Sequence, residues 1–375
     1  MCVIVINGRY LSQPLTGVQR VASELVCALD REIAAGRISP GKARLLLAAP
    51  PGAPLPALES IATVHAGRTM GHCWEQVEFP WLFRHALKVS LSGAAPLAAR
   101  GQVVTFHDAA VFSASESFTL GFKLWYRTLF RLQGRLAAAV ITVSQFSKAE
   151  LSARCSIPDE KLHVVSPSAD HVRRVTPDES ILDRLGLWSR GYALCVGSLH
   201  PNKNLSAVEA ASALMRRAPF EFVVAGGANS VFRRHPVASA GLKFAGRVSD
   251  AELCALYRGA FGFIAPSRYE GFCIPPLEAM HHGCPVIAAN AAAIPETCGD
   301  AALYFDPDRP DQLAAVLSQL YSDPGLQQRL WVRGFARASR FDWQSSARSL
   351  WNVIAALSGV PETKPVVQWE AQCRG

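Results

Sequence analysis

One recurring pattern constrains the fold of this 375-residue chain more than any other: a short apolar run, a turn with glycine or polar residues, and then a helical segment. Runs as short as these are typical of strands buried in a parallel sheet. Strands that alternate with helices build a doubly wound parallel α/β sheet. The sequence therefore predicts this fold class, with strands expected at residues 2–6, 44–50, 88–92, 102–108, 138–143, 162–165, 192–196, 220–227, 242–247, 261–266, 285–289 and 301–305. Helices are expected at residues 21–29, 118–138, 144–150, 205–217, 249–257, 277–282, 310–320, 327–341 and 343–357.

The length and apolar content of the chain indicate two domains. With 375 residues, 50% of them hydrophobic, it exceeds what one ordinary core supports. Residues 166–177 are rich in proline and polar side chains, as a connection between domains would be. We expect a first domain over residues 1–168, a second α/β domain over residues 178–345, and a C-terminal segment over residues 346–375.

The chain is basic, with a net charge of +8, and the larger part of the excess lies in its first half. This favours an acidic partner there, such as lipid head groups or a phosphorylated acceptor, over a nucleic acid, for which no recognised motif is present. Within the helix expected at residues 118–138, Lys123, Arg127, Arg131 and Arg135 recur every fourth residue. They would line one side of a helix that lies on an anionic membrane, although an ordinary solvated face has the same pattern.

Targeting and cysteine patterns indicate a soluble protein in the cytoplasm. No apolar run approaches the length of a bilayer-spanning helix, and the first strand runs into Asn7 without a cleavage pattern. The ten cysteines are scattered without Cys-x-x-Cys spacing. Neither a zinc site nor a disulfide framework is therefore expected.

The segment 268–285 carries the densest group of functional signals. Pro275 and Pro276 suit the first turn of a helix, because proline has no N–H to leave unpaired there. A helix N-terminus that follows a parallel strand is a site for phosphate at the carboxyl edge of the sheet. Two acids flank this terminus, Glu270 and Glu278. The segment is therefore predicted to bind a phosphorylated ligand.

A lysine follows another predicted strand in the same half. Lys203 lies beside the helix expected at residues 205–217, for which Asn204 is the predicted N-cap. At a helix N-terminus a lysine can reach a phosphate that the amides hold.

Two loops of the first half are further candidates. His107 and Asp108 end a strand, where sites form in open α/β sheets; a catalytic histidine and a histidine paired with a carboxylate for structure fit equally well. Gly17 follows the first strand in a nucleotide-type opening. The dinucleotide fingerprint Gly-x-Gly-x-x-Gly is absent, which disfavours a nicotinamide enzyme.

These motifs together resemble one known family. Glu270 and Glu278, with seven residues between them, resemble the paired-glutamate signature of retaining glycosyltransferases of family 4. The other matching motifs follow that family's order and approximate spacing; they are residues 107–108, 143–148, 196–204, 246–250 and 341–343. The resemblance implies the GT-B architecture, in which two Rossmann-like domains face each other across a cleft. The first domain would bind the acceptor and the second the nucleotide sugar, and the last helix would return to the first domain.

The resemblance also implies roles for individual residues. Glu270 would contact hydroxyls of the donor sugar, Glu278 the ribose, and Lys203 the diphosphate. His107 would lie beside the anomeric carbon. The other donor-binding residues implied are Gly17, Arg247, Val248, Gly271, Phe272, Cys273 and Leu277.

The implied chemistry needs no cofactor and no metal ion. The sugar becomes oxocarbenium-like as the nucleoside diphosphate leaves, so the main task is to stabilise the negative charge on the diphosphate. Transfer would proceed with retention. Two departures from the family pattern stand out: Ser198, His200 and Asn202 occupy a loop where relatives have a diphosphate-binding arginine, and Cys273 stands where glycine is common. His200, Arg268 or Arg20 could supply the second cation.

We therefore expect a hexosyltransferase that moves mannose or glucose, for example from GDP-mannose, to a lipid-linked or glycan acceptor in bacterial polysaccharide or lipopolysaccharide biosynthesis. It would be cytoplasmic, in possible peripheral contact with the membrane through the basic helix. Two alternatives remain open. One is a non-catalytic scaffold that binds nucleotide sugars, and the other is a sugar-nucleotide epimerase on the same fold.

Overall fold

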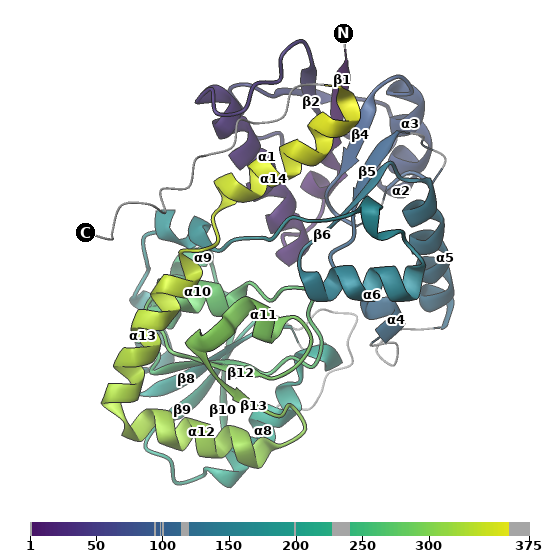
Figure 1. The fold of residues 1–375 in the computed structure, drawn as a ribbon. Helices are drawn as coiled ribbons and strands as arrows, with labels where there is room; N and C mark the ends of the chain where they lie inside the picture. The colour runs from purple at the N-terminus through teal and green to yellow at the C-terminus, as the bar shows by residue number, and fades with distance from the viewer. Residues whose placement is uncertain are drawn as a thin grey trace, which may run out of the picture. The chain divides into compact units, whose positions relative to one another are not determined.

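The computed structural model describes residues 2–93, 95–97, 99, 101–113, 120–198, 200–226 and 241–359. Packing divides the chain into two compact units (Figure 1): residues 1–104, 137–139 and 347 onward, and residues 105–136 and 140–346. Each unit is described by itself. The domain boundaries expected at residues 168 and 178 stay a prediction.

The first sheet has seven strands in the order β3-β2-β1-β4-β5-β6-β7, and its strand pairs are parallel. Its strands are β1 Val3–Asn7, β2 Arg44–Ala49, β3 Ala62–His65, β4 Leu87–Ser90, β5 Gln102–Thr105, β6 Ala139–Thr142 and β7 Leu162–Val164. The expected apolar runs form all of them except β3, which the sequence did not reveal. That strand lies at the edge of the sheet and none of its residues is buried, so it carries no apolar run.

Helices of different lengths connect these strands. They are η1 Gly8–Ser12, α1 Gly17–Ala34, α2 Gly71–Cys73, η2 Trp74–Glu78, α3 Phe79–Leu82, α4 Ala110–Ser113, α5 Leu120–Leu136, α6 Gln145–Cys155 and η4 Asp159–Lys161. Helix α1 is longer than expected, because it begins at Gly17 and continues to Ala34. Ser144 accepts a hydrogen bond from the Ser147 amide, as an N-cap should, so the predicted start of α6 is confirmed.

The second sheet has six strands in the order β10-β9-β8-β11-β12-β13, and its strand pairs are all parallel. Its strands are β8 Tyr192–Val196, β9 Glu221–Ala225, β10 Leu242–Gly246, β11 Gly262–Ala265, β12 Val286–Ala289 and β13 Ala302–Phe305. Every residue of β11 and β12 is buried, as expected for strands covered by helices on both faces. The parallel sheets confirm the predicted α/β class.

Helices cover both faces of the second sheet. They are η5 Asp170–Arg174, α7 Ser180–Leu185, η6 Pro201–Lys203, α8 Leu205–Leu214, α9 Asp250–Gly259, α10 Pro275–His281, α11 Ile294–Cys298, η7 Gly299–Ala301, α12 Pro310–Ser322 and α13 Pro324–Ala338. Figure 1 shows α8 and α12 on one side of the sheet and α9 and α10 on the other. The predicted capping box of α9 is confirmed, since Ser249 and Glu252 exchange side-chain and backbone hydrogen bonds.

The last helix, α14 Trp343–Ser358, passes from one unit to the other at residue 347. Within the first unit, Arg348 of α14 and Arg37 both pair with the fully buried carboxylate of Glu32 on α1, at 2.7 and 2.6 Å. Leu350, Trp351 and Ile354 have no exposed surface. The helix is thus a core element of that unit.

Candidate functional site

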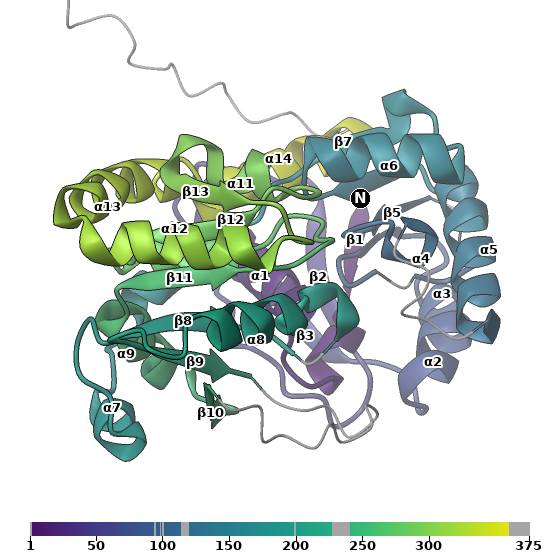
Figure 2. The ribbon, with the colours of Figure 1, turned by 90° about the horizontal axis from the view of Figure 1, so that it is seen from below.

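The order of strands in the second sheet determines where a site can form. The chain runs from β8 outward to β10 and then returns to β11 on the other side of β8. Loops that leave the carboxyl ends of two such neighbouring strands diverge and open a crevice, which is where ligands bind in open α/β sheets. The loop after β8 carries Lys203, and the loop after β11 carries Glu270. Figure 2 shows β8 and β11 side by side.

Lys203 and Glu270 form an ion pair at this point. The Lys203 Nζ donates to Glu270 Oε1 at 2.6 Å, and the two side chains are 32% and 18% exposed. Two residues that are 67 positions apart in the sequence thus meet at a partly open position. A half-buried cation–carboxylate pair at a switch point is suited to bind a ligand that carries both negative charge and hydroxyl groups.

The pair keeps its lysine charged. Burial works to lower the pKa of Lys203, but the charge of Glu270, followed by the effect of Cys273, the hydrogen bond to Glu270 and the effect of Cys195, raises it above its usual value. The ammonium therefore carries a full positive charge across the physiological pH range.

Asp108 interacts electrostatically with this ion pair, although the sequence gave it no separate role. Desolvation raises its pKa above the usual value, the backbone amide of Ala110 opposes this at 2.8 Å, and the charges of Glu270 and Lys203 act on it in opposite directions. Asp108 follows β5, at the strand end that the sequence selected. In the sequence, the His107-Asp108 dipeptide at the end of a strand was the feature that pointed to Asp108.

Gly271 lies in the loop between β11 and α10, which carries Glu270 and is called the glutamate loop below. This glycine allows the loop to come close to His107. A Cβ at Gly271 would lie 2.2 Å from the His107 carbonyl oxygen and 2.9 Å from the Asp108 Cβ, so only glycine fits. The Ser144 and Ser147 hydroxyls donate to the Gly271 carbonyl at 2.5 and 3.1 Å. The glutamate loop is therefore fixed against the end of β5 and the start of α6.

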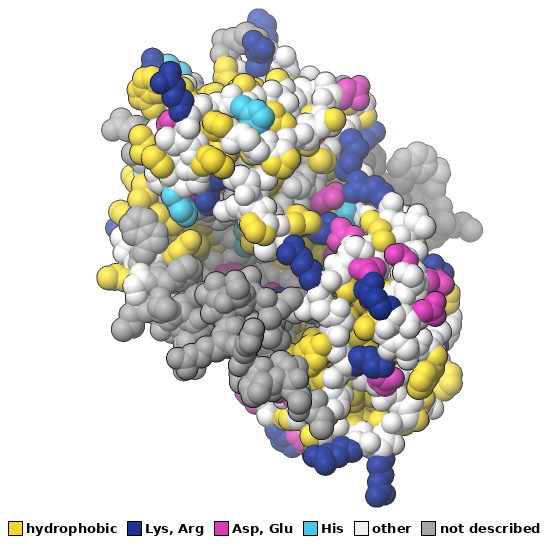
Figure 3. All heavy atoms as spheres, turned by 180° about the vertical axis from the view of Figure 1, so that it is seen from behind, with side chains coloured by type: hydrophobic (Ala, Val, Ile, Leu, Met, Phe, Trp, Pro, Cys, Tyr) yellow, Lys and Arg dark blue, Asp and Glu magenta, His cyan; other side chains and the backbone are white. Residues whose placement is uncertain are grey.

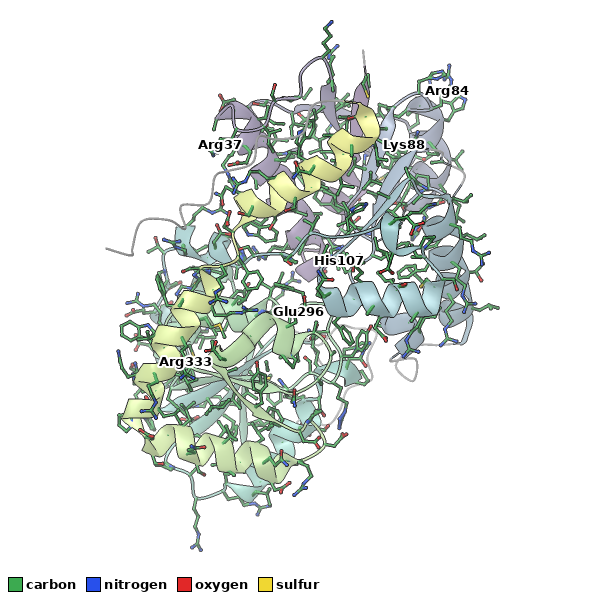
Figure 4. All side chains as sticks on the ribbon, viewed as in Figure 1. Arg37, Arg84, Lys88, His107, Glu296 and Arg333 are labelled. Carbon is green, nitrogen blue, oxygen red and sulfur yellow. The ribbon has the colours of Figure 1, made fainter. Side chains whose placement is uncertain are left out.

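A carboxylate from α11 closes the same end of α6. Glu296 accepts from the backbone amides of Gln145 and Phe146 at 2.8 and 2.9 Å, which caps the free amides of the helix. Figure 4 labels Glu296 and His107, and both lie near the start of α6. This end of α6 is thus occupied by protein groups.

The amides of α10 differ from what the sequence predicted. Pro275 and Pro276 have no N–H, and the amides of Leu277 and Glu278 both donate to the Ile274 carbonyl. The first turn of the helix therefore offers no unpaired amide, so the expectation of unpaired amides there is wrong, and phosphate binding by the segment stays a prediction. Amides that could serve a phosphate are those of the loop before the helix, at residues 271–273, for which no acceptor is recorded in the described part of the chain.

Asn204 also differs from its predicted role as the N-cap of α8. It adopts a left-handed backbone with φ 51°, and its side chain makes no cap hydrogen bond. Its amide group donates instead to the carbonyls of Pro266 and Pro307 at 3.1 and 2.9 Å. The prediction was wrong because a local sequence pattern could not reveal these distant acceptors. Through them Asn204 connects the loop after β8 to the loop after β11.

Glu278 is more buried than Glu270 and already has protein partners. It is 8% exposed, its Oε2 accepts from the Tyr257 hydroxyl at 2.9 Å, and His171 Nε2 lies 3.3 Å from its Oε1. The two glutamates of the motif thus lie in different surroundings. The role of Glu278 on a ribose stays a prediction.

The remaining predicted donor residues fall into three groups. Arg247 is exposed and Val248 half-buried at the carboxyl end of β10. Phe272 and Leu277 are buried in the core of the second sheet. Gly17 belongs to the other compact unit. The structure brings together Lys203, Glu270, Gly271, Cys273 and, on the strand end next to them, His107.

Three residues were candidates for the second cation that the family pattern implies: Arg268, His200 and Arg20. Arg268 is exposed and pairs with Asp308 at 2.7 Å. Burial, followed by the charge of Lys203, lowers the pKa of His200, which favours its neutral form at pH 7. Arg20 belongs to the other unit.

Cys273 has a backbone that glycine adopts readily. Its φ is 73°, and it is 9% exposed. Burial, followed by the charge of Glu270, raises the pKa of its thiol well above the usual value, so the sulfur is neutral beside Lys203. A left-handed non-glycine residue costs about 1–2 kcal/mol. The glycine common at this position in the family thus has a physical reason.

We predict that Cys273→Gly is more stable than Cys273→Ala. Both changes remove the sulfur, but only glycine relieves the left-handed strain. After the entropy that glycine adds to the unfolded chain, the free energies of unfolding should differ by about 0.5–1 kcal/mol. Urea denaturation of the two variants measures this difference, and an alanine variant as stable as the glycine variant would contradict the strain.

The basic helix α5 is only partly free to meet solvent. Arg127 is half-buried, donates to the Val111 carbonyl at 3.1 Å, and lies over the Phe112 ring, as does Arg131. Arg131 and Arg135 are exposed beside Leu132 and Leu136, which are 43% and 57% exposed. The side chain of Lys123 lies outside the described residues. On the face drawn in Figure 3, Lys and Arg side chains are interspersed with acidic and hydrophobic ones.

Sequence models of two glycosyltransferase families match successive parts of this chain. The model described as "Glycosyltransferase Family 4" matches residues 15–173, and the model described as "Glycosyl transferases group 1" matches residues 190–323. The two matches together span most of the chain. Among the described residues, no helix is long and apolar enough to cross a bilayer.

Curated relatives and solved structures agree with these matches. The chain is 29% identical over 268 residues to O-antigen chain mannosyltransferase B of Escherichia coli, covering 68% of this chain and 70% of the relative. It is 28% identical to O-antigen chain mannosyltransferase RfbU of Salmonella typhimurium, again covering 68% and 70%. The structure of Anabaena HepE in complex with UDP-glucose superposes with a TM-score of 0.69 at 16% identity, covering 95% of this chain and all of that one. The fold is therefore GT-B, and the matches together support a glycosyltransferase similar to those of family 4.

Proposed function

We propose that this protein transfers a hexose, mannose or glucose, from a nucleoside diphosphate sugar to a glycan or lipid-linked acceptor in bacterial polysaccharide or lipopolysaccharide biosynthesis. One observation carries the proposal: the Lys203–Glu270 pair at the switch point of the second sheet. The pair places a cation next to a carboxylate. The cation suits the diphosphate of the donor, and the carboxylate suits the hydroxyl groups of the sugar. The names of the curated relatives favour mannose, and the ligand of HepE keeps glucose as an alternative.

The proposed reaction divides the work among these residues. The acceptor hydroxyl attacks the anomeric carbon while the bond from that carbon to the diphosphate oxygen breaks, and the hydroxyl proton passes to the departing diphosphate. Attack on the face that the diphosphate leaves gives retention. Lys203 and the loop amides at residues 271–273 stabilise the charge on the diphosphate, so no metal ion is required. Glu270 orients the sugar through its hydroxyls, and His107 lies beside the reacting carbon.

The test is a transfer assay with a panel of donors. Purified protein is incubated with GDP-mannose, UDP-glucose or UDP-galactose and a glycan acceptor, with and without EDTA. We expect one donor to be used, product of unchanged anomeric configuration by NMR, and the same rate in EDTA. Neither transfer nor donor hydrolysis, together with no calorimetric binding of GDP or UDP, would overturn the proposal.

The same assay separates the two alternatives. A scaffold would bind the nucleotide sugar without turning it over, and an epimerase would convert the donor in the absence of acceptor. A transferase hydrolyses the donor slowly at most when acceptor is missing. The pair between Lys203 and Glu270 favours turnover, since a lysine that neutralises the leaving group serves catalysis rather than storage.

We further propose that α5 contacts an anionic membrane through its exposed arginines and leucines. Replacing both Arg131 and Arg135 with glutamine should weaken the binding to vesicles that contain 30% phosphatidylglycerol by about 30-fold, at roughly 1 kcal/mol for each lost cation, as measured by co-sedimentation. Arg309→Gln, an exposed change on another surface, serves as the control. Equal vesicle binding by the two variants would contradict the contact.

A further inference from the structure

The paired-glutamate motif does not explain by itself how the buried carboxylate of Glu278 is stabilised. Glu278 is 8% exposed, and its neighbours in sequence on α10, Leu277 and Ala279, are buried as well. A carboxylate in such surroundings is costly unless hydrogen-bond donors meet it, and without them it takes up a proton. Two donors do meet it. The Tyr257 hydroxyl lies 2.9 Å from Oε2, and His171 Nε2 lies 3.3 Å from Oε1.

The tautomer of His171 follows from its other neighbour. The indole nitrogen of Trp343 lies 3.5 Å from His171 Nδ1. An indole N–H can only donate, so Nδ1 accepts and the proton of a neutral imidazole is on Nε2. That nitrogen is the one that faces Glu278. The imidazole is therefore a donor to the carboxylate without having to be charged.

The segment that carries His171 is itself held in place. The Ser168 hydroxyl donates to the Phe341 carbonyl at 2.8 Å, and the Trp343 amide donates to Asp170 Oδ1 at 3.3 Å. His171 is 4% exposed. Residues that the sequence suggested were only a connection thus hold one imidazole at a defined position against α10.

We propose that His171 is a positioning residue, which together with Tyr257 holds the Glu278 carboxylate ionised and oriented to accept hydrogen bonds from the ribose hydroxyls of the nucleotide. The inference rests on the proposed function, because it assumes that a nucleotide binds at this site. Tyr257 meets one carboxylate oxygen and His171 the other, and a donor at each oxygen determines the plane of the carboxylate.

The test measures nucleotide affinity with and without ribose hydroxyls. Calorimetry of the full-length protein is performed with GDP and UDP and with their 2′,3′-dideoxy forms. His171→Leu should weaken binding of the better ribonucleotide by about tenfold and that of its dideoxy form by less than about twofold. Tyr257→Phe, which keeps the ring, should behave in the same way. His171→Gln retains a donor amide and should restore most of the affinity.

Control variants distinguish a loss of carboxylate positioning from a loss of folding. His163→Leu, on β7, replaces a half-buried histidine and should leave both affinities unchanged. Circular dichroism and thermal unfolding report whether each variant is folded. Equal losses for ribonucleotide and dideoxy nucleotide, or a Tyr257→Phe variant with unchanged ribonucleotide affinity, would overturn the positioning role alone. A wild-type protein that binds neither GDP nor UDP would overturn the proposed function and this role with it.

Discussion

Replacing Lys203 with alanine is expected to lower kcat for hexosyl transfer by about 10²- to 10³-fold, the loss typical for one preorganised group that stabilises a developing anion. Lys203 is the cation paired with Glu270 at the switch point, at 2.6 Å. Because its charge would act on the departing diphosphate, the loss should appear in kcat as well as in the affinity for nucleoside diphosphate. Steady-state kinetics and calorimetry measure the two effects separately.

The second sheet offers a matched control for this change. Lys243 pairs with Glu221 at the same distance of 2.6 Å, and the two side chains are 33% and 32% exposed. This pair lies at the beginning of β9 and β10, at the amino ends of the strands, away from the loops that form the site. Lys243→Ala should keep kcat within about twofold, since this half-buried pair lies at the amino ends of the strands and not in the loops that form the site. Equal losses in the two variants would remove the catalytic role of Lys203.

Replacing Glu32 with glutamine is expected to lower the free energy of unfolding by about 3 kcal/mol, because it leaves arginines without their charged partner at a buried position. The Glu32 carboxylate has no exposed surface, and Arg348, only 24% exposed, reaches it from α14. Urea denaturation followed by circular dichroism measures the loss. Arg37→Gln removes the more exposed partner, at 54%, and should cost less than about 1 kcal/mol.

The Glu32 cluster should also respond to acid. Burial by itself would raise the pKa of Glu32, but hydrogen bonds and charges from Arg37 and Arg348 outweigh it and lower the pKa below its usual value. The cluster therefore stabilises the fold above the unfolded-state pKa, and this contribution is lost as the pH falls through the lower folded-state pKa. The difference between wild type and Glu32→Gln should shrink in the same range. A pH-independent difference would show that charge is not what the substitution removes.

Much of the fold could be predicted because its signals are local. The apolar runs of β8, β11 and β12 and the capping box of α9 depend on residues within a few positions of one another. The site could be located for a related reason. Lys203 and Glu270 each follow a parallel strand, and all such strands end at one edge of a sheet. Neither residue had to be near the other in sequence for the prediction to place them on one edge.

What could not be predicted depends on partners far along the chain. Asn204 looks like a helix cap in sequence, yet its acceptors are carbonyls 62 and 103 residues away. Gly271 is required by the carbonyl of His107, which no local pattern reveals. His171 lies in a segment that reads as a linker, and only packing brings it to Glu278 and Trp343.

The sequence by itself determined the alternation of strands and helices, the family, and the edge of the second sheet where Lys203 and Glu270 lie, because backbone preference and burial pattern act over a few residues. The tertiary structure alone decided the order of the strands, the contact between the two charges, and the partners of Asn204, Gly271 and Glu278. Those features arise from contacts between distant segments. Their energies depend on distances and burial that exist only after the chain has folded.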